Sequence, residues 1–143
     1  MKILPLSIDH AEELAQLNAR NFGDGWTKNM IISAFNSKRF FAFGAYLEDK
    51  LIGSITISMG DEDADVEGVV VDKNQRGKGI AYKLLEQAHS LILQQGKRKT
   101  LLEVRESNLP AIRLYEKAGY KRISVRKRYY SDDENALVML KEF

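Results

Sequence analysis

The sequence predicts an α/β (α+β) fold with a mixed, mostly antiparallel central sheet of about seven strands and helices on both faces of the sheet. The first observation is the order of elements: a strand, two helices, three strands, a helix, a strand, a helix and two strands. The second is a pair of β-rich runs, 40–47 and 51–59, joined by the hairpin signal Glu48-Asp49-Lys50. The third is an apolar strand that runs through a glycine-rich turn into an amphipathic helix.

The first half of the chain begins with a strand, which we expect at Ile3–Ile8. Asp9 can then cap a helix that continues to about Phe22, because apolar residues recur there at helical spacing. The segment Gly23-Asp24-Gly25 is expected to end this helix. Thr27 can cap a second helix, whose apolar residues are Met30, Ile31, Ala34 and Phe35.

The second half opens with a strand at Val66–Val71. Apolar residues at helical spacing then begin at Ile80, and Gly96 stands where a C-cap glycine is favoured. A strand follows at 100–105. Ser107 or Asn108 can then cap a short helix, which has Pro110 in its first turn and ends at Gly119. The last two strands are expected at 120–125 and 136–140.

The composition excludes several classes of protein. The chain has 143 residues, 44% hydrophobic and 29% charged, which suits one globular domain over residues 1–143. We see no apolar run of membrane-spanning length and no signal peptide. Because there is no Cys and there are only two His, we expect no disulfide framework and no metal site. A net charge of +2 does not by itself indicate nucleic-acid binding, and the lack of Cys is consistent with the cytoplasm.

The most informative segment is the turn between residues 71 and 80. It carries Gly77 and Gly79 beside Arg76 and Lys78, and it opens directly into the helix that starts near Ile80. The first N–H groups of a helix lack internal partners, and the helix dipole adds positive charge there. This combination predicts an anion site that suits a pyrophosphate. The alternative is a tight turn whose basic side chains are simply solvated.

Two other phosphate-binding motifs do not match this turn. It lacks the Lys-Ser/Thr pair that follows the last glycine of a P-loop. It also lacks the three-glycine dinucleotide fingerprint, and the element order is not the alternating βαβ type.

The segment Arg76-Gly77-Lys78-Gly79-Ile80-Ala81 resembles the R/Q-x-x-G-x-G/A signature of the GCN5-related N-acetyltransferase (GNAT) superfamily. The resemblance implies the GNAT fold and acetyl-CoA as cosubstrate. It also implies that backbone N–H groups of this turn hold the coenzyme pyrophosphate, while the preceding strand pairs with the pantetheine arm. The implied cofactor-binding residues are Val69, Val70, Val71, Arg76, Gly77, Lys78, Gly79, Ile80, Ala81, Tyr82 and Asn108.

Later segments resemble the RimI-type ribosomal-protein alanine N-acetyltransferases. The matching patterns are LEVR-x-SN at 102–108, A-I-x-LYE-K-x-G-Y at 111–120 and YY-x-D-x-E-x-A-x-x-M at 129–139. The resemblance implies acetylation of the N-terminal alanine of a basic ribosomal protein. The pair Glu67-Gly68 departs from that subfamily, which leaves the acceptor open.

Two residues are candidate catalytic groups. An α-amino group has a pKa of about 7.7–8.0, so a nearby carboxylate can remove its proton before attack. Glu103 stands within an apolar strand, and the resemblance favours it as this base over the alternative of an exposed charge pair, with Glu67 as a rival. Tyr115 is implied as the general acid for the coenzyme thiolate; otherwise it is a core tyrosine. With no Cys, direct attack is preferred over an acyl-enzyme.

Other interpretations remain open at this point. Asn108 can cap its helix as well as bind the coenzyme, and Tyr129 and Tyr130 can border the acceptor groove or pack at a sheet edge. The acceptor can instead be a small amine such as a polyamine, amino acid or antibiotic. A binding module without catalysis, which uses the basic stretch 121–128, is the alternative from another class. We expect no membrane partner, and the sequence does not predict an oligomeric state.

Overall fold

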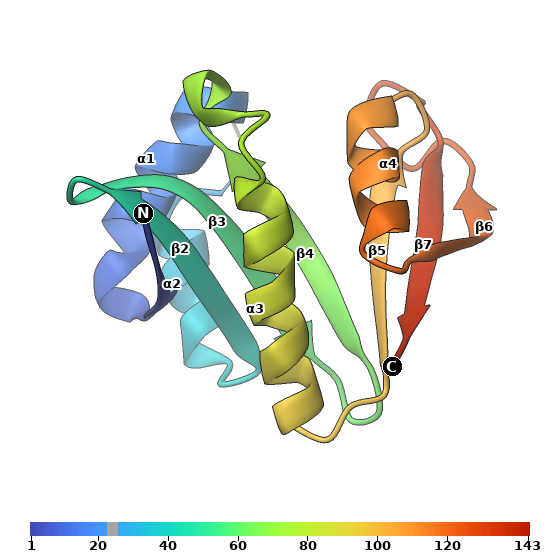
Figure 1. Cartoon of the computed structure of the whole chain (residues 1–143), viewed down its shortest axis with the longest axis horizontal. Coiled ribbons are helices and arrows are strands. Elements are labelled where there is room, and N and C mark those ends of the chain that lie inside the picture. The colour runs from blue at the N-terminus through green and yellow to red at the C-terminus, as the bar shows by residue number, and fades with distance from the viewer. Residues whose placement is uncertain (23–25) are drawn as a thin grey trace.

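The computed structural model describes residues 1–22 and 26–143 and confirms the predicted order of elements (Figure 1). The predicted helix stop at Gly23-Asp24-Gly25 lies outside the described residues. The strands are β1 (Lys2–Leu6), β2 (Phe40–Leu47), β3 (Lys50–Met59), β4 (Ala64–Val71), β5 (Lys99–Arg105), β6 (Lys121–Arg126) and β7 (Ala136–Glu142). The helices are α1 (Ala11–Phe22), α2 (Lys28–Asn36), α3 (Ile80–Gln94) and α4 (Leu109–Lys117), with short 3-10 turns η1 (Ile8–His10) and η2 (Lys73–Gln75).

The strands form one sheet in the order β1-β2-β3-β4-β5-β7-β6. All neighbours are antiparallel except β4 and β5, which run parallel. This parallel pairing is short, because it joins only Ala64–Val66 to Thr100–Leu102. Beyond those residues the two strands separate, as Figure 1 shows. The sheet is therefore divided along most of the length of β4.

The hairpin between β2 and β3 has the predicted turn. Glu48 and Asp49 both have positive φ values, 50° and 67°. A two-residue turn with positive φ at both positions has the twist that joins antiparallel strands without splaying them. The prediction of a hairpin at residues 48–50 is confirmed, with Lys50 as the first residue of β3.

The helices cover both faces of the sheet, as predicted (Figure 1). Leu14 and Leu17 of α1 and Ile31 of α2 are fully buried against one face, in a cluster that includes Val70 of β4. Leu84 and Leu85 of α3 are fully buried on the other face, in the cluster that also holds residues of α4. Each cluster removes a continuous apolar surface from water, which provides most of the stabilisation of such a layered fold.

The helix caps agree with the sequence in two of three cases. The side chain of Thr27 accepts a hydrogen bond from Met30 N at 3.3 Å, and the side chain of Asn108 accepts one from Ala111 N at 3.3 Å. The prediction that Asp9 caps the first helix is wrong. Ser7 caps the 3-10 turn η1, which leads into α1: the Ser7 Oγ accepts a hydrogen bond from Asp9 N at 3.3 Å, and the Ser7 N–H donates to His10 Nδ1 at 2.9 Å.

A β-bulge interrupts β4 where it faces β3. Thr56 pairs with Gly68 and Ile57 pairs with Val66, so Glu67 is the extra residue. A bulge bends its strand and redirects the side chain of the extra residue. Glu67 therefore stands at a bend in the strand that borders the gap in the sheet.

No helix among residues 1–22 and 26–143 is long and apolar enough to cross a membrane.

Candidate functional site

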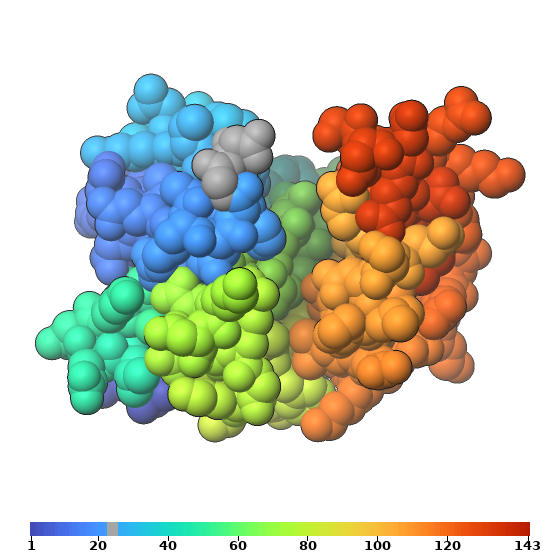
Figure 2. All heavy atoms as spheres, turned by 90° about the horizontal axis from the view of Figure 1, so that it is seen from above, coloured from blue at the N-terminus to red at the C-terminus, as the bar shows by residue number. Residues whose placement is uncertain are grey.

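The separation of β4 and β5 opens a groove through the molecule. Figure 2 shows it from above, between the blue-to-green half that carries α1 and α3 and the orange-to-red half that carries α4. A cavity of about 570 Å³ lies in this groove, and it is lined by β4, by the turn before α3 and by the first turns of α3 and α4. This volume falls within the range of small-molecule sites.

The turn before α3 lines this cavity with its backbone at Gly77 and Gly79. Gly77 and Gly79 both have a φ of 80°, a region that glycine adopts without strain. Gly79 is the N-cap of α3, and no side chain among residues 1–22 and 26–143 caps this helix end with a hydrogen bond. A Cβ at either glycine would meet no protein atom within 4 Å, so the backbone faces open space. The N–H groups here can therefore bind an anion, with the positive end of the helix dipole behind them.

Most of the residues implied as cofactor contacts line this larger cavity. They are Val69, Val70, Val71, Arg76, Gly77, Gly79, Ile80, Ala81, Tyr82 and Asn108. Lys78 does not line it, and its Nζ donates to Gln75 Oε1 at 3.0 Å. The cavity also contains residues that we did not predict, namely Phe22, Gln75, Pro110, Ala111 and Leu114. Of these, Gln75 directly precedes the 76–81 motif and Pro110 directly precedes the 111–120 motif. Their places beside these motifs could have predicted that they line the cavity.

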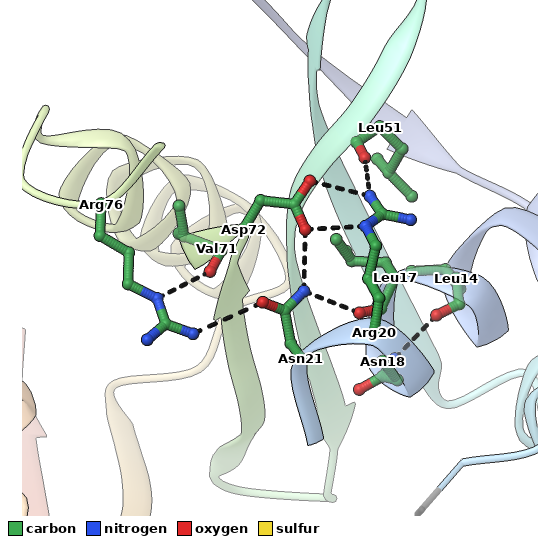
Figure 3. Close-up of polar contacts among 9 residues, drawn as sticks. All are labelled: Leu14, Leu17, Asn18, Arg20, Asn21, Leu51, Val71, Asp72 and Arg76. Atoms are coloured by element: carbon green, nitrogen blue, oxygen red, sulfur yellow. Dashed lines mark hydrogen bonds and ion pairs between the residues drawn. The ribbon is translucent and has the colours of Figure 1, made fainter. Parts of the chain in front are cut away.

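The end of β4 is tied to the last turn of α1 by a polar network (Figure 3). Arg20 donates from Nε to Asp72 Oδ1 at 2.8 Å and from Nη2 to Asp72 Oδ2 at 2.9 Å. Asn21 Nδ2 donates to Asp72 Oδ1 at 2.9 Å and to Leu17 O at 2.8 Å. Asp72 is 6% exposed, so its charge requires these donors.

The same network reaches the candidate anion site. Arg76 Nε donates to Val71 O at 3.0 Å, and its Nη2 makes a longer contact of 3.5 Å with Asn21 Oδ1. Desolvation alone would raise the pKa of Asp72. The hydrogen bonds from Arg20 and Asn21 outweigh that effect, so the pKa lies below its usual value and the carboxylate stays charged.

A second cavity, of about 320 Å³, adjoins the first. Phe22, Val69 and Val70 line both. The other lining residues of this smaller cavity are Asn18, Trp26, Ser54, Thr56, Glu67 and Gly68. The signal that could have revealed it is the run of hydroxyls at a spacing of two along β3, Ser54, Thr56 and Ser58, of which the first two line the cavity.

The two candidate bases stand at the vertex of the groove. The pairing between β4 and β5 ends at Val66 and Leu102, and Glu67 and Glu103 are the next residues of the two strands. Glu67 lines the smaller cavity, whereas Glu103 lines neither. Glu103 Oε2 is buried without a hydrogen bond in the described part of the chain, and it lies 3.7 Å from Arg126 Nε.

The region around the vertex is acidic. Partial desolvation, followed by the charges of Glu67 and Glu103, raises the pKa of Asp65. The charge of Glu103 also raises the pKa of Tyr129, so this tyrosine faces the same carboxylate. A negative potential of this kind attracts a protonated amine.

Tyr115 lines the larger cavity from α4 and is 9% exposed. Burial, with a smaller contribution from Tyr130, raises its pKa to about 12. The hydroxyl therefore keeps its proton at neutral pH and remains a hydrogen-bond donor. Tyr130 lies beside it and is covered by Arg105, whose Cζ is 4.1 Å from the ring centre. Arg105 Nη1 also forms ion pairs with Asp132 Oδ2 and Glu134 Oε1, at 2.9 Å each. These ion pairs hold the loop before β7 in place.

The cavities together suit a donor with a diphosphate and an extended arm. The anion-binding turn can receive the diphosphate, and the edge of β4 beyond Val66 is not paired with β5, so its backbone can pair with an extended chain. No group of three or more His, Asp or Glu among the described residues could hold a metal ion. A diphosphate site beside a second pocket suits an enzyme of the acyltransferase class, which binds a coenzyme thioester next to its acceptor.

Comparison with known proteins identifies the family. Residues 11–120 match the model of the acetyltransferase (GNAT) family. The chain belongs to this family, and it is an acetyltransferase that uses acetyl-CoA as donor.

Among its relatives is a protein of Bacillus subtilis to which [ribosomal protein bS18]-alanine N-acetyltransferase activity is provisionally ascribed. It is 31% identical over 134 residues, which are 92% of this chain and 87% of that protein. Streptothricin acetyltransferase of Escherichia coli is 35% identical, but over 54% of this chain and 45% of that enzyme.

Two solved structures share the fold. The ribosomal-protein-S18-alanine N-acetyltransferase of Escherichia coli has a TM-score of 0.90 and 24% identity, over 99% of this chain and 92% of that one. The PaiA N-acetyltransferase of Thermoplasma acidophilum, solved in complex with coenzyme A, has a TM-score of 0.82 and 19% identity over the full length of both chains.

Proposed function

We propose that this protein acetylates the N-terminal amine of a protein, and that its acceptor is the N-terminal alanine of a basic ribosomal protein. The observation that carries this acceptor is the 31% identity along 92% of the chain to the Bacillus subtilis relative. The acidic vertex formed by Asp65, Glu67 and Glu103 supports it, because a basic N-terminus is attracted to negative charge. A cytoplasmic location is part of the proposal.

In the proposed reaction the donor binds along β4, with its diphosphate on the backbone of residues 76–81 and its arm beside Val69–Val71. Asn108 lines the same cavity and has its Oδ1 engaged as the cap of α4. A backbone N–H of β4 can donate to the thioester oxygen and stabilise the negative charge that develops there. The acceptor amine then approaches from the smaller cavity.

The chemical step is direct transfer. The nitrogen lone pair attacks the thioester carbon, the C–S bond breaks, and the coenzyme leaves as a thiolate. Glu103 accepts the proton that the nitrogen loses, directly or through a water. Its Oε2 supports this role, because it has no hydrogen-bond partner among the described residues and only a 3.7 Å ion pair with Arg126. Tyr115 donates its proton toward the sulfur from the wall of the donor cavity.

The experiment compares N-terminal peptides from cells with and without this chain by mass spectrometry. We expect one ribosomal protein to lose acetylation at an N-terminal alanine, and a peptide of that N-terminus to be acetylated by the purified protein. If no protein terminus changes while the purified protein acetylates a free polyamine, amino acid or antibiotic, the proposed acceptor is wrong.

A further inference from the structure

The turn that faces the donor cavity is not held by packing. From Lys73 to Gly79 no side chain is buried, and the buried residues on either side are Asp72 and Ile80. Gly77 and Gly79 are not packed against neighbouring atoms, since a Cβ at either position would meet nothing within 4 Å. The position of the turn relative to the rest of the molecule therefore depends on its two ends and on the hydrogen bonds of Arg76.

Asp72 fixes the first of these ends. Its N–H donates to Ile52 O at 2.8 Å, and its carbonyl accepts from Gln75 N at 2.8 Å, which closes η2. Its side chain accepts from Arg20 and Asn21 at 2.8–2.9 Å. Arg20 is anchored in turn, because its Nη2 also donates to Leu51 O at 2.6 Å. Asp72 is the one buried charged residue in the described part of the chain.

The hydrogen-bond partners of Asp72 belong to the last turn of α1, and residues of this turn line both cavities. Phe22 lines the donor cavity and the smaller cavity, and Asn18 lines the smaller one. Figure 3 shows Asn18, Arg20 and Asn21 on this one turn of helix, with Arg76 on the opposite side of Asp72. One carboxylate thus joins the helix that shapes the acceptor side to the turn that faces the donor.

We propose that Asp72 is a positioning residue for acetyl transfer: through Arg20 and Asn21 it holds the diphosphate-binding turn against the end of α1, and so sets the donor and acceptor cavities relative to each other. The proposal rests on the assignment of this turn to the donor. Asp72 itself lines neither cavity. It acts because a buried carboxylate with charged and neutral donors allows only one arrangement of the two segments.

The test is steady-state kinetics of Asp72→Asn with two donors, acetyl-CoA and S-acetylpantetheine, which lacks the diphosphate. Loss of a hydrogen bond to a charged group is expected to raise the KM for acetyl-CoA about tenfold or more. The KM for the acceptor is expected to rise as well, and kcat at saturation to stay near the wild-type value. The KM for S-acetylpantetheine should be unchanged, because this donor does not use the turn.

Two further variants keep the test decisive. Asn21→Ala leaves the Arg20–Asp72 ion pair in place and should raise the KM for acetyl-CoA less than Asp72→Asn does. Glu12→Gln is the matched control. It also removes one negative charge, but from the start of α1, where Glu12 forms an ion pair with Lys28 that is more than half exposed on both sides, and it should change neither KM.

Unchanged KM values in folded Asp72→Asn, or an equal rise with both donors, would overturn the proposal. If Asp72→Asn does not fold, Asn21→Ala is judged by the same comparison of donors. A wild-type protein that binds no acetyl-CoA would be a different result, because it would remove the donor site itself.

Discussion

Glu67 on β4 and Glu103 on β5 occupy equivalent positions at the vertex of the groove, because each directly follows the last residue that pairs β4 with β5, Val66 or Leu102. The two carboxylates differ in their surroundings. Glu67 stands at a bulge and lines the smaller cavity, whereas Glu103 has an oxygen without a hydrogen bond beside Arg126. Because the two positions are equivalent but the surroundings differ, the same Glu→Gln change at each residue compares the two candidate bases directly.

Glu103→Gln is expected to lower kcat about a hundredfold, the usual contribution of a general base, while the affinity for acetyl-CoA stays the same. Glu67→Gln is expected to raise the KM for the acceptor with a smaller effect on kcat, because Glu67 lines the acceptor side. The measurement is kcat and KM for each variant, together with donor binding by calorimetry. If Glu67→Gln loses kcat and Glu103→Gln does not, the roles of the two residues are reversed.

Tyr115→Phe is expected to lower kcat by about tenfold to a hundredfold, because the departing thiolate loses its proton donor. Donor affinity should change little, since the ring remains in place. Tyr46→Phe is the matched control, because Tyr46 also has its pKa raised to about 12, by burial and by Glu13, but lines neither cavity. Full turnover by Tyr115→Phe would remove Tyr115 from the mechanism.

Gly79→Ala tests the anion-binding turn. At a φ of 80° an alanine costs about 1–2 kcal/mol of stability. Its Cβ would also project into the space where the diphosphate is proposed to bind, so donor affinity should fall by more than the strain explains. Gly96→Ala is a close control, because Gly96 has a φ of 82° and similar open surroundings at the other end of α3. Equal donor affinity in the two alanine variants would argue against a diphosphate at Gly79.

The lowered pKa of His89 makes the stability of the folded protein depend on pH. Burial, and to a lesser degree the charge of Lys141, lowers the pKa of His89 from 6.5 to about 4. Between pH 6.5 and about 4, His89 binds a proton in the unfolded chain but not in the folded protein. The free energy of unfolding therefore falls as the pH falls from 6.5 towards 4. His89→Gln should flatten this dependence, as thermal melts at a series of pH values would show. Parallel melting curves for wild type and variant would contradict the prediction.

Local patterns in the sequence predicted most of the fold. The hairpin turn, the Thr27 and Asn108 caps and the periodicity of α3 each depend on neighbouring residues, and each is confirmed. The cap of the first helix was mispredicted, because Ser7 forms a capping box with His10 in place of the usual Glu or Gln.

Features that depend on distant residues could not be predicted from such patterns. Arg20 and Asp72 are 52 positions apart, so no local spacing indicates their ion pair. The separation of β4 from β5 is likewise a property of the sheet. It decides that Glu67 lines a cavity while Glu103 does not, although both are acidic residues in apolar strands.

Titration calorimetry with acetyl-CoA tests the central claim most directly. We expect one molecule to bind per chain with a dissociation constant of about 1 μM to 1 mM, the range of enzyme–substrate affinities. S-acetylpantetheine should bind much more weakly, because most of the anchoring is expected at the turn before α3. An absence of binding, or equal affinity for the two donors, would contradict the account of a diphosphate held by the backbone of residues 76–81.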